Sequence, residues 1–347
     1  MKAAVTNGDG TVRLAEVPRP EPGDYECLCR IAACATCTGT DQKLIAGAMP
    51  YETHYPAVLG HESVGRVVAR GRNVRHIRDG AVFLRPMAVY PGGKLGDYHS
   101  LWGGFAEYGL VTDVRALAED RPDASARHAT RYQQRVPSDP AISASDATIL
   151  ITLKEIATFL VNVGVRFNAS AVVLGSGPVA MAICFVSKLM GLSPVIVVGR
   201  RAEPLARCRA VGADFTINTR QEDMVGRVQQ ITDRAGVDFV FDAAGSEELI
   251  AKAGALLASG GKLAVYAIGE SAHYTLDRFG GPSAWDLCFS GPSEERGHDY
   301  VLGLARLNAI PFAAFYSHTM PFAELEQGFA LLKQKKASKI VFEMKKG

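Results

Sequence analysis

The sequence predicts an α/β protein of two domains, a β-rich domain followed by a doubly wound parallel sheet. Three observations predict this. A length of 347 residues corresponds to two domains at roughly 100–200 residues each. Hydrophobic residues make up 48% and charged residues 21% of the chain, which is typical of packed proteins and excludes a mainly disordered chain. Near residue 145, short strands separated by Gly and Pro give way to strands that alternate with helices.

The first domain is expected to span residues 1–147. Short runs rich in Val, Ile, Tyr and Phe, with Gly and Pro between them, are typical of strands. The arginine-containing segment 116–140 shows little periodicity and is interpreted as an inserted surface excursion. It is either a solvated loop or a lid or site for an anionic substrate group. The predicted strands cover residues 11–17, 25–33, 63–70, 81–86 and 104–111.

The second domain is expected to span residues 148–304, and residues 305–347 are expected to return to the first. Apolar runs alternate with helical segments, which indicates parallel strands joined by helices. We predict helices at 149–163, 179–190, 203–211, 224–234 and 247–257, and strands at 171–174, 194–198, 214–217, 238–241 and 262–268. In the returning segment we predict a helix at 322–334 and a strand at 338–342.

A glycine turn, Gly175-Ser176-Gly177-Pro178-Val179-Ala180, joins the strand at 171–174 to the following helix. Gly175 permits the tight turn, Gly177 lets the backbone approach a pyrophosphate, and Ala180 lets the helix pack closely on the strand. The helix that starts at Pro178 and Val179 offers free N–H groups and the positive end of its dipole to phosphates. The pattern predicts a dinucleotide site; the alternative is a turn that only connects two elements.

The tip of the next strand, Gly199-Arg200-Arg201, carries no carboxylate. An NAD enzyme normally has Asp or Glu at this place, where it accepts hydrogen bonds from ribose hydroxyls. Two guanidinium groups attract a 2′-phosphate instead and can bind it bidentately. The sequence therefore predicts NADP(H) in preference to NAD(H). Alternatively, the arginines are a solvated helix start whose charge Glu203 compensates.

A cysteine, a histidine and a glutamate in the first domain form a candidate metal site. Cys37 precedes Thr38-Gly39-Thr40-Asp41, and His61-Glu62 follow an apolar stretch that ends at Gly60. Sulfur, imidazole and carboxylate are donors that suit zinc. The spacing between Cys37 and His61 is loose and is not diagnostic by itself. It becomes specific in combination with the predicted dinucleotide-binding domain.

Four motifs occur together along the chain: Gly60-His61-Glu62, Gly103-Gly104-Phe105-Ala106-Glu107-Tyr108, Gly175–Ala180 and Ser338-Lys339-Ile340-Val341. In this combination the chain resembles the zinc-containing medium-chain dehydrogenase/reductase family, which includes alcohol, sorbitol, threonine and glucose dehydrogenases. The resemblance covers essentially the whole chain. It implies a GroES-like catalytic domain joined to a Rossmann domain, with zinc and substrate in the cleft between them.

The resemblance also implies roles for individual residues. Cys37 and His61 look like zinc ligands, Glu62 looks like a third ligand or one that exchanges with water, and Thr40 resembles the hydroxyl residue that starts a proton relay. The family's usual Cys-Gly-Thr-Asp is interrupted here by Thr38. Either a one-residue bulge keeps Cys37 as the ligand, which we favour because threonine is a poor zinc ligand, or Thr38 takes its place.

Two further departures concern the number of ions and the fourth ligand. Many members hold a second, structural zinc in a lobe of four cysteines, but no cysteine lies between Val82 and Val111. At most one zinc per chain is therefore expected. Sorbitol-dehydrogenase-like members place a glutamate where this chain has Ile151. Glu155, one helical turn further on the same face, either serves instead as a ligand or is an ordinary helix carboxylate.

The predicted function is zinc-dependent interconversion of a secondary alcohol and its ketone with NADP(H). A polyol, sugar or cyclitol is favoured, by analogy with Gly-His-Glu members and because the loop at 270–296 is polar. Two alternatives are a zinc-free NADPH reductase of enones or quinones and a non-catalytic NADPH-binding protein. Zinc-free reductases of this fold typically lack the Cys and His-Glu positions. In a non-catalytic NADPH-binding protein, mutational drift would be expected to erase the ligand residues.

Charge and cysteine content bear on partners and compartment. A net charge of +2 favours neither nucleic acid nor a membrane surface, and no apolar run is long enough for a spanning helix. The first residues lack the apolar core of a signal peptide, and seven cysteines are too sparse for a disulfide framework, so we expect a cytoplasmic protein. A homodimer or homotetramer is expected by resemblance, with 262–268 as the edge strand.

Overall fold

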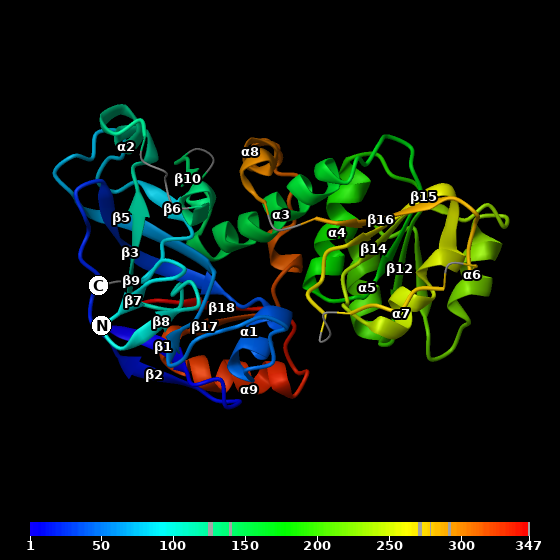
Figure 1. Cartoon of the computed structure of the whole chain (residues 1–347), viewed down its shortest axis with the longest axis horizontal. Coiled ribbons are helices and arrows are strands. Elements are labelled where there is room, and N and C mark those ends of the chain that lie inside the picture. Colours follow the sequence, from blue (N-terminus) through cyan, green and yellow to red (C-terminus); the bar gives the residue numbers. More distant parts are fainter. Residues whose placement is uncertain (124–127, 139–140, 270–272, 278, 291–292, 346–347) are drawn as a thin grey trace. The chain divides into compact units, whose positions relative to one another are not determined.

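The computed structural model describes residues 1–123, 128–138, 141–269, 273–277, 279–290 and 293–345 (Figure 1). The chain divides into two compact units. Unit 1 comprises Met1–Thr152 and Val301–Gly347, and unit 2 comprises Leu153–Tyr300.

Unit 1 contains two sheets. In the larger one, β3 (Glu26–Ala35) pairs antiparallel with β5 (Glu62–Arg70), with β9 (Tyr108–Thr112) and with β18 (Ile340–Glu343). The same sheet includes β6 (Val82–Leu84), β10 (Arg135–Val136) and β17 (His318–Pro321). The smaller sheet has the order β2 (Val12–Glu16), β1 (Lys2–Thr6), β4 (Ala57–Val58), β8 (Tyr98–Ser100) and β7 (Lys94–Leu95).

The hairpin of β7 and β8 occupies the stretch in which a cysteine lobe is absent. Leu95 and Tyr98 pack against an apolar cluster that includes Val5 and Val58. Burial of apolar surface stabilises such a hairpin by about 25 cal/mol per Å². Apolar packing therefore stabilises this part of unit 1.

The C-terminal segment returns to the N-terminal strands, as the red and blue ribbons of unit 1 show (Figure 1). β18 pairs with the end of β3, placing Phe342 opposite Cys34. The fully buried ring of Phe105 meets those of Phe329 and Phe342 edge-on, each with its centroid 5.8 Å away. Phe329 comes from α9 (Leu325–Lys333), so residues more than 200 positions apart share one core.

Unit 2 is a six-stranded parallel sheet with strand order β13-β12-β11-β14-β15-β16. Its strand order is that of a Rossmann fold, and the order reverses between β11 and β14. The strands are β11 (Ala171–Leu174), β12 (Val195–Gly199), β13 (Phe215–Asn218), β14 (Val237–Asp242), β15 (Leu257–Val265) and β16 (Trp285–Phe289).

The helices follow the predicted alternation in unit 2. They are α4 (Pro178–Leu189), α5 (Ala202–Ala210), α6 (Met224–Ile231) and α7 (Glu247–Ala251). Unit 1 contains α1 (Thr38–Ile45) and α2 (Val114–Asp120). Both α3 (Ala144–Asn162) and α8 (His298–Arg306) cross the boundary between the units. None of the described helices is both long and apolar enough to span a membrane.

Three predictions need correction. The helix expected at 247–257 ends at Ala251 and continues as the 3-10 turn Ala253–Leu256. The strand expected at 262–268 is not the sheet edge, because β16 pairs with β15 from within the segment expected as the polar loop 270–296. The strand β16 was missed because the neighbouring residues Asp286 and Leu287, which point to opposite faces, are both exposed, so the strand shows no regular alternation.

The segment 116–140 is only partly an excursion. Its start lies in α2, which Asp113 caps by accepting a hydrogen bond from the Ala116 N–H. Tyr132 and Gln133 are buried, so this part is not a solvated loop. Residues 124–127 and 139–140 of the segment lie outside the described part of the chain.

Candidate metal centre and dinucleotide site

Three predicted ligands come together in unit 1. The donor atoms of Cys37, His61 and Glu62 all lie within 4.8 Å of one another. Cys37 is the residue before α1, and Glu62 is the first residue of β5. Gly60 has φ +106°, and a Cβ there would lie 2.5 Å from the Phe105 backbone nitrogen. Only glycine permits this close turn, which delivers His61 and Glu62 to the cluster.

Asp41 lies behind the histidine and is 1% exposed. Its Oδ2 accepts a hydrogen bond of 2.9 Å from the Cys37 N–H, and its Oδ1 lies 3.6 Å from His61 Nδ1. Burial raises the pKa of Asp41 to about 7, although His61 opposes the shift. Among the described residues, Asp41 Oδ1 has no hydrogen-bond partner. A carboxylate behind a histidine orients a metal-binding ring, so this orphaned oxygen fits a metal on the far ring nitrogen.

Glu62 is held by a buried cation and a hydroxyl. Lys339 Nζ forms an ion pair with Glu62 Oε2, and both side chains are almost completely buried. Thr152 Oγ1, on α3, lies 3.4 Å from Glu62 Oε1 and 3.3 Å from Lys339 Nζ. From the sequence, no role was predicted for Asp41, Thr152 or Lys339. Two of them stood within quoted motifs, but nothing in the sequence indicated the position of Thr152.

The loop with the extra residue places Cys37 in the donor group. Cys37 Sγ lies 3.5 Å from Thr40 Oγ1, the candidate proton-relay hydroxyl. The Thr38 hydroxyl instead donates to the Ser338 carbonyl. Burial raises the pKa of the Cys37 thiol, and a bound cation would oppose that shift because it stabilises the thiolate. Sulfur, nitrogen and oxygen donors in one group fit zinc.

Glu155 is not part of this donor group. It lies on α3 beyond Thr152, within unit 2. Its role as a fourth ligand stays a prediction. Thr152, also on α3, hydrogen-bonds Glu62 through its hydroxyl.

The glycine turn lies where the strand order of unit 2 reverses. Gly175 has φ +116°, and a Cβ there would meet Ala243 and Ala244, which follow β14, at 3.3 Å. Gly177 caps α4, and a Cβ at this exposed position would meet no atom within 4 Å. Pro178 and Val179 begin α4. Open α/β sheets bind ligands at the carboxyl ends of the strands, at the point where the strand order reverses.

The end of β12 lies beside this turn. Gly199 is buried, and a Cβ there would lie 2.6 Å from Ser176 Oγ, within the glycine turn. Arg200 and Arg201 are exposed, and Arg201 immediately precedes α5. The two guanidinium groups therefore follow a strand whose tip contacts the turn.

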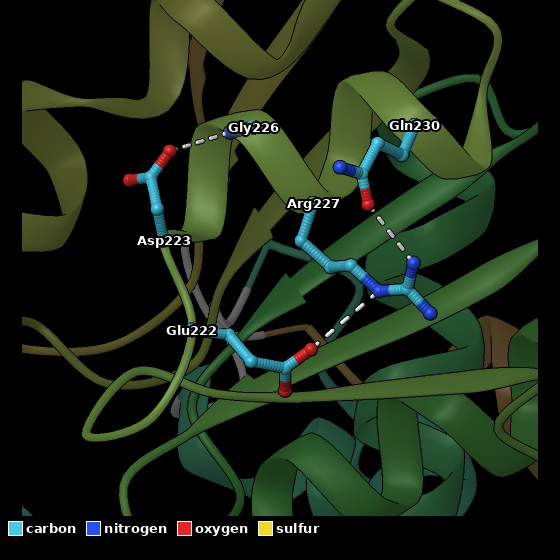
Figure 2. Close-up of a pocket in the computed structure, with 5 residues that line it drawn as sticks. All are labelled: Glu222, Asp223, Gly226, Arg227 and Gln230. Carbon is cyan, nitrogen blue, oxygen red and sulfur yellow. Dashed lines mark hydrogen bonds and ion pairs between the residues drawn. The ribbon is translucent and has the colours of Figure 1, made fainter.

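A pocket elsewhere on unit 2 is lined by Glu222, Asp223, Gly226, Arg227 and Gln230 (Figure 2). Arg227 lies 3.5 Å from Glu222 and 3.1 Å from the Gln230 side-chain oxygen. Asp223 accepts from the Gly226 N–H at 2.8 Å. These groups contact one another, and none of the predicted site residues lines the pocket.

Comparison with known proteins identifies the family. The alcohol dehydrogenase GroES-like domain matches residues 23–119, and the zinc-binding dehydrogenase domain matches residues 178–280. The chain belongs to the zinc-containing medium-chain dehydrogenase/reductase family. The predicted fold class, a GroES-like domain with a Rossmann sheet, is thereby confirmed.

Individual relatives are distant but extend over most of the chain. Sorbitol dehydrogenase of Bacillus subtilis is 26% identical over 76% of this chain and 74% of its own length. The NADP-dependent isopropanol dehydrogenase of Thermoanaerobacter brockii is 25% identical over 96% of this chain and 97% of its own. The solved structure of alcohol dehydrogenase TADH from Thermus sp. ATN1 superposes with a TM-score of 0.82 at 23% identity, covering 99% and 100% of the two chains. The two curated relatives support an oxidoreductase, and the solved structure supports the fold.

Proposed function

We propose that this protein is a zinc-dependent oxidoreductase that interconverts a secondary alcohol of the polyol, sugar or cyclitol type and its ketone, using NADP(H). The observation that carries the proposal is the donor group of Cys37, His61 and Glu62, in which Glu62 is buried and the other two are half-buried. Asp41 supports it, because its orphaned oxygen faces the histidine ring. A histidine with a purely structural role would not require a thiol and a carboxylate whose donor atoms lie within 4.8 Å of its ring nitrogen.

In this proposal, zinc supplies a Lewis acid that lowers the pKa of the substrate alcohol, and NADP(H) carries the hydride. Cys37, His61 and Glu62 hold the ion, while Asp41 orients the His61 ring. Lys339 and Thr152 fix the carboxylate of Glu62. Thr40, whose hydroxyl lies beside Cys37 Sγ, accepts the substrate proton and passes it outward.

Metal analysis together with an alcohol panel tests this function. We expect about one zinc per chain in purified protein, with turnover of polyols or sugars and NADP⁺. The panel includes short and long aliphatic alcohols as comparison substrates. Well under one zinc per chain would remove the Lewis-acid mechanism and favour a zinc-free enone or quinone reductase. Bound zinc without turnover of any panel member would favour a non-catalytic NADPH-binding protein.

The preference for NADP(H) is proposed from Arg200 and Arg201, and the name of the T. brockii relative agrees with it. Replacing Gly199 by Asp, the direct design from the sequence, would push a Cβ against Ser176. The cleaner variant is Arg200→Ala/Arg201→Ala. Loss of charge-assisted hydrogen bonds of about 1.5–3 kcal/mol should lower the NADPH over NADH preference by about 10–100-fold.

Arg207→Ala/Arg209→Ala is the matched control for this pair. Both residues lie on α5, where Arg207 pairs with Glu203 at 3.8 Å and Arg209 donates to Thr216 at 3.2 Å. The ratio of kcat/KM for the two cofactors should not change in the control. If the Arg200→Ala/Arg201→Ala variant also keeps the wild-type ratio, these arginines do not bind the 2′-phosphate and the assignment is refuted.

We also propose that the protein is a cytoplasmic homodimer or homotetramer in which β16 forms the contact between copies. Within the described part of the chain, β16 pairs on one side only, with β15. Leu287 and Phe289 on this strand are 39% and 61% exposed. An exposed apolar edge strand is a template for pairing with another chain. Light scattering of Phe289→Lys should then show a smaller assembly than the wild type.

A further inference from the structure

Arg85 is a buried arginine beside the candidate metal centre, immediately after β6. It is 4% exposed and has φ +57°. Residues other than glycine seldom adopt a left-handed backbone, and they keep it only where the surroundings enforce it. Trp102, whose ring lies near the Arg85 guanidinium, also has a positive φ of +73°. Two such residues together indicate a constrained local arrangement.

Arg85 binds the backbone on both sides of Glu62. Its N–H donates to the Ser63 carbonyl at 2.7 Å, and its Nη1 donates to the His61 carbonyl. The Arg85 carbonyl accepts a hydrogen bond of 3.2 Å from Gln133 Nε2. One residue therefore anchors the tripeptide that carries two of the three donor side chains.

Aromatic rings fix the guanidinium in turn. Its central carbon lies 5.3 Å from the Trp102 ring centroid and 5.8 Å from that of Tyr132. The two rings are 5.9 Å apart. A guanidinium within about 6 Å of an aromatic ring is attracted to it, and its planar fork is less easily replaced than a lysine point charge.

We propose that Arg85 is a positioning residue for the metal centre. It holds the His61 and Ser63 carbonyls at fixed points, so that the His61 ring and the Glu62 carboxylate point at the same place as Cys37 Sγ. Arg85 touches neither the ion nor the substrate in this role. The proposal rests on the zinc site of the proposed function but extends it to a residue outside the donor group.

The test measures zinc affinity directly, by competition with a chromophoric chelator, in Arg85→Met and in the matched control Arg66→Met. Arg66, on β5, makes the same kind of contact, donating from Nη1 to the Gly80 carbonyl at 2.6 Å, but it is exposed and outside the donor group. Residues that orient metal ligands typically change metal affinity by about 10–100-fold. We expect a loss in this range for Arg85→Met and no change for Arg66→Met.

The visible spectrum of the cobalt-substituted protein supplies a second readout, because a reoriented imidazole changes the ligand field even when the metal stays bound. Arg85→Lys, which keeps the positive charge and one hydrogen-bond donor, should recover part of the zinc affinity. This variant also decides the outcome if Arg85→Met does not fold. Wild-type affinity and an unchanged cobalt spectrum in Arg85→Lys and in any folded Arg85→Met would overturn the proposal. Wild-type protein that binds no zinc would instead refute the proposed function itself.

Discussion

The candidate metal centre of unit 1 is built from side chains, whereas the dinucleotide turn of unit 2 is built from backbone. Cys37, the adjacent pair His61 and Glu62, and Lys339 come from three places in the chain and meet in one group. The turn from Gly175 to Val179 is one contiguous stretch, with Gly177 exposed at the helix start. A backbone site needs small residues in a local order, while a side-chain site needs distant segments brought into register.

The two sites also differ in electrostatic cost. Ions in the interior are expensive unless they are paired, and the metal centre holds Lys339, Glu62 and Asp41 with little exposure. The turn presents N–H groups and a helix dipole to solvent, so it buries no ion. Substitutions at the metal centre should therefore affect both function and stability, and substitutions at the turn should affect cofactor binding alone.

The largest effect is expected for His61→Ala. Zinc binding and turnover should be lost by more than the ~10–100-fold typical of residues that only orient a ligand, while NADPH affinity stays near that of the wild type. Zinc per chain, kcat/KM and NADPH fluorescence titration measure these three quantities. His76→Ala, a histidine of unit 1 outside the donor group, is the control. Equal loss of zinc and NADPH binding would point to a folding defect instead.

Lys339→Met should cost stability. Glu62 would be left buried without its cation, which typically lowers the free energy of unfolding by about 3–5 kcal/mol. Lys252→Met, which removes an exposed pair with Glu248 at 3.0 Å, should cost about 0.5 kcal/mol. Chemical denaturation of metal-free protein measures both. Saturating zinc should reduce the Lys339→Met deficit, because the ion supplies Glu62 with a new positive partner; a deficit that zinc does not change contradicts this account.

Gly177→Ala should separate cofactor binding from folding. A Cβ at this position meets nothing in the protein, so the melting temperature should stay the same. It would nevertheless occupy the space through which a pyrophosphate approaches, and we expect NADPH affinity to fall about tenfold, or about 1.4 kcal/mol. Gly175→Ala, at φ +116°, should lower both quantities. Unchanged NADPH affinity in Gly177→Ala would exclude the turn as the phosphate site.

The smallest effect is expected at a surface network remote from the donor group. Hydrogen bonds from His76, Arg75 and Arg115 lower the pKa of Glu119 from 4.5 to about 2. Because the pKa is depressed in the folded state, this stabilisation is present above pH 4.5 and is lost as the pH falls toward 2. Glu119→Gln should therefore melt slightly below the wild type at pH 7 and together with it near pH 2. A constant difference across this range would show that Glu119 acts through packing.

Many elements of unit 2 were predictable because each depends on residues that are close together in the sequence. The strand at 171–174 and the start of α4 followed from an apolar run, two glycines and a proline. Strand β16 was missed because its half-exposed residues lack a regular period. The helix at 247–257 was predicted too long, since periodicity does not reveal the change to a 3-10 turn at Ala253.

For the metal centre, residue types could be predicted but their surroundings could not. Cys37, His61 and Glu62 were chosen for their chemistry and family motif, and the structure groups their donor atoms. No local pattern linked Glu62 to Lys339, which lies 277 positions away, or to Thr152. The contacts of Arg85 with two carbonyls and two aromatic rings could not be predicted either, because they join residues far apart in the sequence.

The sequence by itself determined the alternation of strands and helices, the glycine turn with its exposed helix start, and the kinds of donor atom available for a metal. These depend on side-chain size, backbone freedom and chemistry within a few residues. Only the tertiary structure decided which cation neutralises Glu62, which carboxylate lies behind His61, and which strand forms the sheet edge. The edge of the parallel sheet depends on the pairing of β16 with β15. The partners of Glu62 and His61 depend on the register of β3 with β5 and β18, because charges and hydrogen bonds act through space over a few ångströms whatever their separation along the chain.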